Sequence, residues 1–506
     1  MTFAATESRL DGGKFGDHGV LSEVERVRLR LSNETDAGKK SRLGQFLTPE
    51  SVATFMASLF SVPVGGACRL LDAGAGVGSL TSAFLDQWGE HFEAVEASAF
   101  ELDDVIREHL AETLSSYARK LPIETRIEGG DFIEHAVNWL QFGRASGFTH
   151  AILNPPYKKI NARSRHRLLL REIGIETVNL YTAFVGLAVA MMEPGGQVVA
   201  IIPRSFCNGP YYRPFREFVL ARAAIRHIHL FESRKKAFKG DAVLQENVIV
   251  AFECGATQGP VVVSMSTDNS FADYVAHEHQ FDRIVFPTDA ERFIHVPTSQ
   301  KSNPLELCES VNHTLMDIGV TVSTGPVVDF RLNEHLRSMP EDGTVPLLYS
   351  AHFAGESIEW PKPGFKKPNA IARNAETERW LYPNGFYVVV RRFSSKEERR
   401  RIVASVVEPD RFPGAEALGF ENHLNVFHEK RHGLPEDLAR GLAVFLNGTA
   451  IDDYFRQFNG HTQVNATDLR TMKFPSRAQL AALGKWAINR RKLSQEDIDD
   501  RLSDLE

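Results

Sequence analysis

The residues with the clearest chemical potential form one tetrapeptide, Asn154-Pro155-Pro156-Tyr157. The two prolines stiffen the backbone and remove two N–H donors, so the surrounding carbonyl groups point outward as acceptors. Asn154 adds a side-chain carbonyl, and Tyr157 adds a flat aromatic face. Such a cluster can hold a planar amino group by both hydrogens, and drawing its nitrogen toward tetrahedral geometry exposes the lone pair to an electrophile. The tetrapeptide therefore predicts chemistry on the amine of an aromatic base; the alternative interpretation is a rigid turn with a core tyrosine.

A glycine-rich segment, Asp72-Ala73-Gly74-Ala75-Gly76-Val77-Gly78, follows one apolar run and precedes a helical pattern. Glycines let the chain turn tightly against a ligand, and the amides of a helix N-terminus face whatever lies in the loop. Glu96 closes the next apolar run, at the position from which an acidic side chain reaches ribose hydroxyls in such folds. The loop alone also suits a strand-to-helix turn that binds nothing. Loop and acid together favour a cofactor that contains a nucleoside.

Short apolar runs that alternate with helical stretches position these motifs. They begin with RLLDAGAG at Arg69 and recur near 92–97, 125–132, 149–157, 196–203, 226–232 and 247–253. Near-continuous apolar strands separated by helices indicate a mostly parallel sheet that is covered on both faces. We therefore expect a doubly wound, Rossmann-like α/β domain. Only a polar loop separates the last two runs, so we expect them to pair antiparallel at one edge of the sheet.

Three segments are expected along the chain. Residues 1–43 form an N-terminal extension, with a short helix over Leu21–Leu31 and a linker over Asn33–Lys40. Residues 44–255 form the α/β domain. Residues 256–506 mix strand-like and helical pieces with many Pro and Gly breakers, which predicts an α+β domain that starts near the Gly255–Pro260 turn.

Composition restricts the classes of protein that fit. Charged residues make up 24% and hydrophobic residues 43%, which excludes a disordered or fibrous chain. The net charge of −7 means that any surface for nucleic acid must be local. Four scattered cysteines without a CxxC pair argue against a disulfide framework and a zinc site and predict a reducing compartment. The N-terminus lacks an apolar signal core and no apolar stretch is long enough to span a bilayer, so we expect a cytoplasmic protein without a membrane partner.

In this order the motifs resemble the S-adenosylmethionine-dependent amino-methyltransferases of class I fold, specifically the gamma-arranged N6-adenine DNA methyltransferases. In that family a segment before the glycine loop closes over the cofactor, and GQFLTP at residues 44–49 is similar to it. The cofactor-binding residues that the resemblance implies are Phe46, Thr48, Asp72, Gly74, Gly76, Gly78, Glu96, Asp131, Phe132 and Asn154. The implied catalytic residues are Asn154, Pro155, Pro156, Tyr157 and Phe238, with Phe238 stacking on the extruded adenine. One departure lies after Glu96, where many relatives have an Asp-Pro pair and this chain does not.

The C-terminal half resembles the target-recognition domain of stand-alone type II enzymes of the PstI/BsuBI kind. Segments 321–331, 386–393 and 458–475 carry this resemblance. Clusters of basic residues could follow DNA phosphates, and the alternative for each is a solvated face. The clusters are Lys235-Lys236, Lys366-Lys367, Arg391-Arg392 and Arg399-Arg400-Arg401.

The resemblance therefore implies a site-specific DNA adenine N6-methyltransferase, the modification component of a type II restriction-modification system. Double-stranded DNA is the expected partner, a cognate restriction endonuclease is a functional partner, and a monomer is expected. No metal is required, because a sulfonium already activates the methyl group. Two alternatives stay open. NPPY is shared with enzymes that methylate adenine in RNA or glutamine in proteins, and the chain could be a catalytically silent DNA-recognition subunit.

Overall fold

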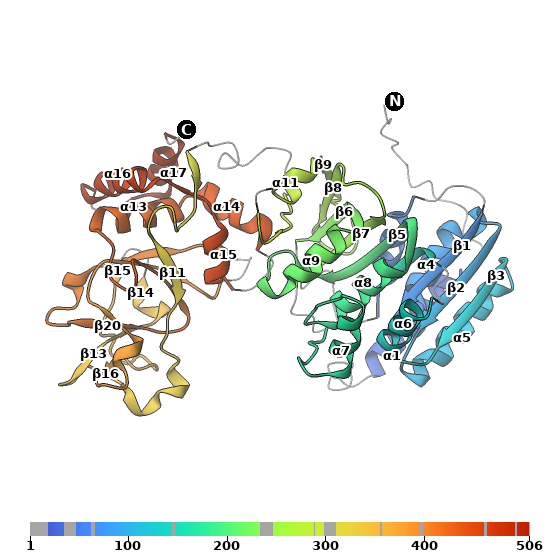
Figure 1. Ribbon diagram of the computed structural model, residues 1–506, viewed down its shortest axis with the longest axis horizontal. Coiled ribbons are helices and arrows are strands. Elements are labelled where there is room, and N and C mark those ends of the chain that lie inside the picture. Colours follow the sequence, from blue (N-terminus) through green and yellow to red (C-terminus); the bar gives the residue numbers. More distant parts are fainter. Residues whose placement is uncertain are drawn as a thin grey trace. The chain divides into compact units, whose positions relative to one another are not determined.

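The computed structural model describes residues 19–34, 47–61, 66–143, 147–232, 246–287, 289–297, 310–354, 357–394, 398–459, 463–490 and 493–504. The chain divides into two compact units (Figure 1). The first comprises Met1–Phe206 and Tyr211–Phe281, and the second comprises Cys207–Pro210 and Asp282–Glu506. In the part of the chain that the structure describes, no helix is long and apolar enough to cross a membrane.

A nine-stranded sheet forms the centre of the first unit, in the order β3-β2-β1-β4-β5-β7-β6-β8-β9. Its strands are β1 (Ala67–Ala73), β2 (Ala94–Phe100), β3 (Ile123–Glu128), β4 (Phe148–Leu153), β5 (Met192–Pro203), β6 (Ala223–Phe231), β7 (Asn247–Cys254), β8 (Val261–Ser266) and β9 (Val275–His279). Strands β1 to β5 are mutually parallel, whereas β7 runs antiparallel between β5 and β6. The expected doubly wound α/β class is confirmed.

The end of this sheet differs from the expectation in two ways. The β6–β7 pairing is antiparallel as predicted, but it does not lie at the edge of the sheet. Strand β8 pairs with β6, and β9 pairs with β8 and is the edge strand. The first unit consequently ends at Phe281 rather than near the Gly255–Pro260 turn. The strand-to-helix rhythm stops at that turn because β8 and β9 follow without crossover helices, so the loss of rhythm does not mark the boundary of the unit.

Helices cover the two faces of the sheet. Right-handed crossovers place helices on opposite faces when the strand order reverses, which happens between β1 and β4. One group packs around α1 (Val20–Glu34), which includes the predicted helix over 21–31, and contains α3 (Glu50–Ser58), α4 (Ser79–Trp88) and α5 (Asp104–Ala118). In the other group, α6 (Phe132–Gln141) and α9 (Arg213–Leu220) pack against α8 (Leu180–Met191), and α7 (Arg165–Glu172) packs against α6. The reversal opens a crevice at the carboxyl ends of β1 and β4, where ligands bind in such folds.

Among its described residues, the second unit contains a four-stranded sheet, a five-stranded sheet, two two-stranded sheets and a group of helices. Four strands pair in the order β11-β21-β18-β19, namely β11 (Thr321–Thr324), β21 (Leu424–His428), β18 (Tyr387–Arg391) and β19 (Ala404–Val407). Five pair in the order β12-β16-β13-β20-β17, namely β12 (Leu336–Arg337), β16 (Ala370–Ala372), β13 (Thr344–Leu348), β20 (Ala417–Phe420) and β17 (Leu381–Pro383). The helices are α13 (Glu436–Leu446), α14 (Thr449–Phe458), α15 (Ala466–Thr471), α16 (Arg477–Ile488) and α17 (Gln495–Ser503).

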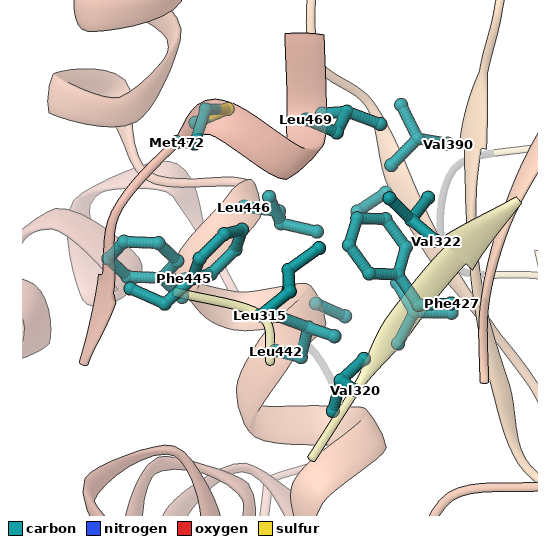
Figure 2. Packing of buried hydrophobic residues seen from close by; sticks show 14 of the residues in the cluster. Leu315, Val320, Val322, Val390, Phe427, Leu442, Phe445, Leu446, Leu469 and Met472 are labelled. Atoms are coloured by element: carbon teal, nitrogen blue, oxygen red, sulfur yellow. The ribbon is translucent and has the colours of Figure 1, made fainter. Parts of the chain in front are cut away.

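A hydrophobic core joins the four-stranded sheet to these helices (Figure 2). Val322 of β11 and Phe427 of β21 lie beside Leu442 of α13, and all three side chains are fully buried. Helices α13 and α16 approach at Gly441 and Gly484, where an added Cβ would lie 1.7 Å from a carbonyl oxygen of the other helix. Because both contacts are with backbone, a larger residue at either position must separate the two helices.

Candidate functional site

A cavity of about 640 Å³ opens at the carboxyl ends of β1, β2, β3 and β4. Four consecutive loops contribute most of its wall, as the switch in strand order predicts. The lining residues are Leu47, Gly74, Gly76, Phe100–Val105, Gly130–Ile133, Asn154, Pro156, Lys158, His166, Leu180 and Phe184.

The glycine loop after β1 forms one wall. Gly74 and Gly76 have φ angles of +82° and +56°, which favour glycine. A Cβ on Gly76 would lie 2.7 Å from Cδ2 of Leu47, so the segment before the loop packs closely against this glycine. The N–H of Gly74 donates to the carbonyl of Phe100 at 2.9 Å, which ties the loop to the end of β2.

Asp72 and Gly78 flank the loop and lie outside the cavity lining. The Asp72 carboxylate is buried and accepts a hydrogen bond from the Thr81 hydroxyl at 2.7 Å, which joins the end of β1 to the first turn of α4. Burial raises the pKa of this carboxyl to about 7. Gly78 precedes α4 with a φ of +90° and packs against Leu110 and Thr113. The structure therefore gives both predicted cofactor ligands a role in shaping the loop.

The acidic residue at the end of β2 is Glu101, not Glu96. Glu96 lies inside the strand with an exposed side chain, because β2 continues to Phe100 through small residues. Glu101 is buried, lines the cavity, and accepts the N–H groups of Gly76 and Asp103 at 3.0 and 2.8 Å. Burial raises the pKa of its carboxyl, and these two N–H donors counteract that rise. Glu101 is followed by Leu102-Asp103, so the Asp-Pro pair is missing after this acid as well.

Asp131 and Phe132, which the resemblance assigns to the cofactor, lie in the cavity wall at the start of α6. Oδ1 of Asp131 accepts the N–H of Ile133 at 2.9 Å and caps the helix, while Oδ2 lies 3.0 Å from Nε2 of His166. The Phe132 ring is 5.0 Å from that of Phe100 and 4.8 Å from that of Phe184, centroid to centroid. This side of the cavity is thus an aromatic wall beside a carboxylate.

The tetrapeptide follows β4 and opens on the same cavity. Asn154 and Pro156 line it, whereas Pro155 is buried behind them. The Tyr157 hydroxyl lies 3.2 Å from both Oδ1 of Asn154 and the carbonyl oxygen of Ile201 in β5, and it can donate a hydrogen bond to either. Burial raises the pKa of Tyr157, so its hydroxyl stays protonated at neutral pH.

Thr48 makes the second hydrogen bond to the side-chain amide of Asn154. Nδ2 of Asn154 donates to Oγ1 of Thr48 at 2.9 Å, and Thr48 is itself buried just before α3. The amide is therefore contacted on its nitrogen by one segment and on its oxygen by Tyr157. Phe46 and Phe238 lie outside the described residues.

Several residues that line the cavity were not predicted from the sequence. Lys158 directly follows the tetrapeptide, so its position in the chain offered a signal. His166 and Phe184 come from helices whose patterns are typical of packing, and they offered none. Carboxylates of Glu101 and Asp131 dominate the charge around the aromatic wall. That charge suits a neutral or cationic nucleoside better than a phosphate, which fits the sulfonium of S-adenosylmethionine.

Not all of the basic clusters predicted to contact DNA phosphates are exposed in the second unit. Arg401 is 1% exposed and donates to Oδ1 of Asn459 at 2.7 Å, so it cannot face DNA. Arg400 donates to the carbonyl of Gly448 at 2.8 Å and is part-buried. These two assignments are wrong, because both guanidinium groups are used inside the unit. Lys235-Lys236 lies outside the described residues.

Comparison with known proteins adds family information. The model of the Eco57I restriction-modification methylase family matches residues 28–238. The chain is 51% identical over 494 residues to the type II methyltransferase M.BsuBI of Bacillus subtilis, covering 96% of this chain and 98% of that protein. It is 42% identical over 486 residues to the type II methyltransferase M.PstI of Providencia stuartii, covering 94% and 95%. The cryo-electron microscopy structure of a DrdV–DNA complex has a similar fold, with a TM-score of 0.53 at 12% identity, covering 94% of this chain and 60% of that one.

Proposed function

The chain belongs to the type II methyltransferases of restriction-modification systems, and we propose that it methylates the exocyclic N6 of adenine within a specific sequence of duplex DNA. It is a DNA methyltransferase, and S-adenosylmethionine is its cofactor. The observation that carries the choice of an amino group is the Asn154 amide, which lines the cavity while Thr48 and Tyr157 hold it at both ends.

The residues in the cavity suit the cofactor. When bound, S-adenosylmethionine supplies a methyl group that its sulfonium already activates. Glu101 would accept hydrogen bonds from the ribose hydroxyls, in place of the predicted Glu96. Asp131 and Phe132 would flank the adenine ring, and the loop of Gly74 and Gly76 would contact the rest of the cofactor.

The tetrapeptide would hold the target amine. Oδ1 of Asn154 can accept one N6 hydrogen, and a backbone carbonyl beside the prolines can accept the other. Both bonds strengthen as positive charge develops on the nitrogen, so they favour the transition state over the ground state. The base must leave the duplex to reach the cavity, which costs a few kcal/mol. Stacking on Tyr157, and on Phe238 as the resemblance implies, would offset part of that cost.

The second unit would select the DNA sequence. We retain the interpretation of residues beyond Phe281 as a target-recognition domain, because segments 321–331, 386–393 and 458–475 all lie there. A cognate endonuclease as functional partner, a monomeric state and action on DNA in the cytoplasm belong to the same proposal.

A methylation assay tests this function. Purified protein, labelled S-adenosylmethionine and duplex DNA should yield N6-methyladenine on nucleoside mass spectrometry, and sequencing of methylated genomic DNA should give one short motif. N4-methylcytosine as the product would contradict the adenine assignment. Transfer to RNA or protein alone, or no transfer by a folded protein that binds DNA, would favour the alternatives.

A further inference from the structure

Three segments that are far apart in the sequence meet at one end of the four-stranded sheet. Strands β11 and β18 both run antiparallel to β21, with Thr324 opposite Asn425 and Arg391 opposite Leu424. The residues that follow β11 and β18 therefore lie beside the turn 421–423 that precedes β21. Two of these segments, 321–331 and 386–393, are ones that the sequence singled out.

The turn before β21 has a fixed backbone. The N–H groups of Glu421, Asn422 and Leu424 donate to backbone carbonyls at 3.0, 2.9 and 3.0 Å, and that of His423 donates to Oε2 of Glu421 at 3.0 Å. Gly325 packs so closely that an added Cβ would lie 2.3 Å from the Glu421 carbonyl oxygen. Side chains on this turn are consequently held in place.

A buried carboxylate lies beside an exposed histidine on this turn. Glu421 is 0% exposed, and Nδ1 of His423 lies 2.9 Å from its Oε1 while 43% of the histidine side chain is exposed. Burying a carboxylate is costly unless it has partners, and the N–H of His423 and the imidazole are two such partners. The imidazole contact has the distance of an ion pair without the alignment of a hydrogen bond, and no hydrogen bond within the described residues uses Nε2. A carboxylate beside Nδ1 leaves Nε2 available to a ligand.

Aromatic and cationic side chains lie on this histidine's ring and on the neighbouring segments. The Phe393 ring lies 4.8 Å from the His423 ring and is 48% exposed, and Phe330 is 68% exposed. Asp329, next to Phe330, pairs with Lys367 at 2.6 Å, and the Arg331 guanidinium lies 5.4 Å from the Phe330 ring. The backbone before Asp329 lies beside the turn, because Val327 pairs with Glu421 and its carbonyl accepts the N–H of Asn422 at 2.9 Å. We call Phe330, Arg331, Lys367, Phe393 and His423 the sheet-end patch.

We propose that the sheet-end patch contacts the base pairs of the recognised DNA sequence, with His423 as a residue that determines specificity and Glu421 as its positioning residue. Nε2 can hydrogen-bond a base edge, Arg331 and Lys367 can contact phosphates, and the exposed phenylalanines can press against bases or sugars. Cations and exposed rings around a fixed hydrogen-bonding group favour duplex DNA over a protein surface. The inference rests on the proposed function, in which the second unit binds duplex DNA.

Methylation of altered sites tests the inference on the full-length protein. Once the wild-type motif is mapped, duplexes with one base pair replaced at each position are compared with the intact site in single-turnover assays. His423→Ala should lose discrimination roughly tenfold at one or two positions and retain it elsewhere. Glu421→Gln should affect the same positions more weakly, because it loosens the histidine without removing it. His432→Ala, an exposed histidine of the same unit, is the matched control.

Direct binding gives a second measurement. Phe330→Ala and Phe393→Ala should weaken binding of the intact site severalfold, whereas Phe142→Ala, which removes an exposed ring of the first unit, should not. Wild-type discrimination in folded His423→Ala together with wild-type binding in both phenylalanine variants would overturn the inference and favour a protein contact at the patch. The readout counts methyl groups on any base, so a cytosine product would contradict only the adenine assignment.

Discussion

The cavity of the first unit and the sheet-end patch of the second both lie where strands end, but the strands run differently. Parallel strands bring four consecutive loops to one edge, so a concave site forms from segments that follow one another in the chain. In the antiparallel sheet, the same edge collects the end of one strand and the start of another. The contacts there join residues such as Gly325 and Glu421 across long stretches of sequence. Short motifs can therefore reveal the first site but not the second.

The largest effect is expected from Asn154→Ala. It removes the side-chain acceptor for the target amine, and losing one such group costs roughly 100- to 1000-fold in turnover. Single-turnover methylation measures the loss. The affinity for S-adenosylmethionine, measured by calorimetry, and the affinity for DNA should stay close to those of the wild type. Near-normal turnover would show that the tetrapeptide only shapes the chain.

The second-largest effect is expected on cofactor affinity, and it distinguishes Glu101 from Glu96. Glu101→Ala should weaken S-adenosylmethionine binding by roughly 10- to 100-fold, because hydrogen bonds to a charged group are worth about 1.5–3 kcal/mol. Glu96→Ala is the matched control and should leave the affinity unchanged, since that side chain is exposed away from the cavity. A larger loss of cofactor affinity, measured by calorimetry, in Glu96→Ala than in Glu101→Ala would restore Glu96 as the predicted ribose ligand.

A third experiment addresses charge in the second unit. Replacing Arg331 and Lys367 with Ala should weaken DNA binding by roughly tenfold and reduce the slope of log affinity against log salt by about 0.9 for each phosphate that is no longer neutralised. Arg373, which pairs with Glu378 and Glu416, supplies the control variant. Replacing the buried Arg401 should instead lower the free energy of unfolding. An unchanged salt slope in the double variant would remove phosphate binding from the patch.

The smallest effect concerns pH. The Asp72 carboxyl has a pKa of about 7 when folded, above its ordinary value of 3.8, so folding favours the protonated form. Its stabilisation is complete below the ordinary value and is lost as pH rises through about 7. Between about pH 6 and about pH 8 the free energy of unfolding should fall by about 1.4 kcal/mol from this group. Urea unfolding of the wild type and of Asp72→Asn, which cannot titrate, should diverge over this range; parallel curves would contradict the assignment.

Local signals predicted the fold of the first unit and much of its site. Asn154-Pro155-Pro156-Tyr157 and the glycine loop each stand beside an apolar run, so both chemistry and position are visible in a few residues. Glu101 was missed because spacing from the loop fits Glu96 as well, and the alanines between them do not mark where a strand ends. Burial of Arg401 depends on Asp452 and Asn459, which no local pattern links to it. The same holds for the Glu421–His423 pair, whose surroundings come from four separate segments.

The fixed backbone of the turn 421–424 has a consequence for how the protein can change. All four of its N–H groups are bonded to carbonyls or to the Glu421 carboxylate, and none of these bonds uses the side chains of Asn422 or His423 as acceptor. Those two side chains can be exchanged while the frame that presents them stays intact. A library randomised at these positions, selected by protection of plasmid DNA against different endonucleases, is thus a direct route to methyltransferases of altered specificity.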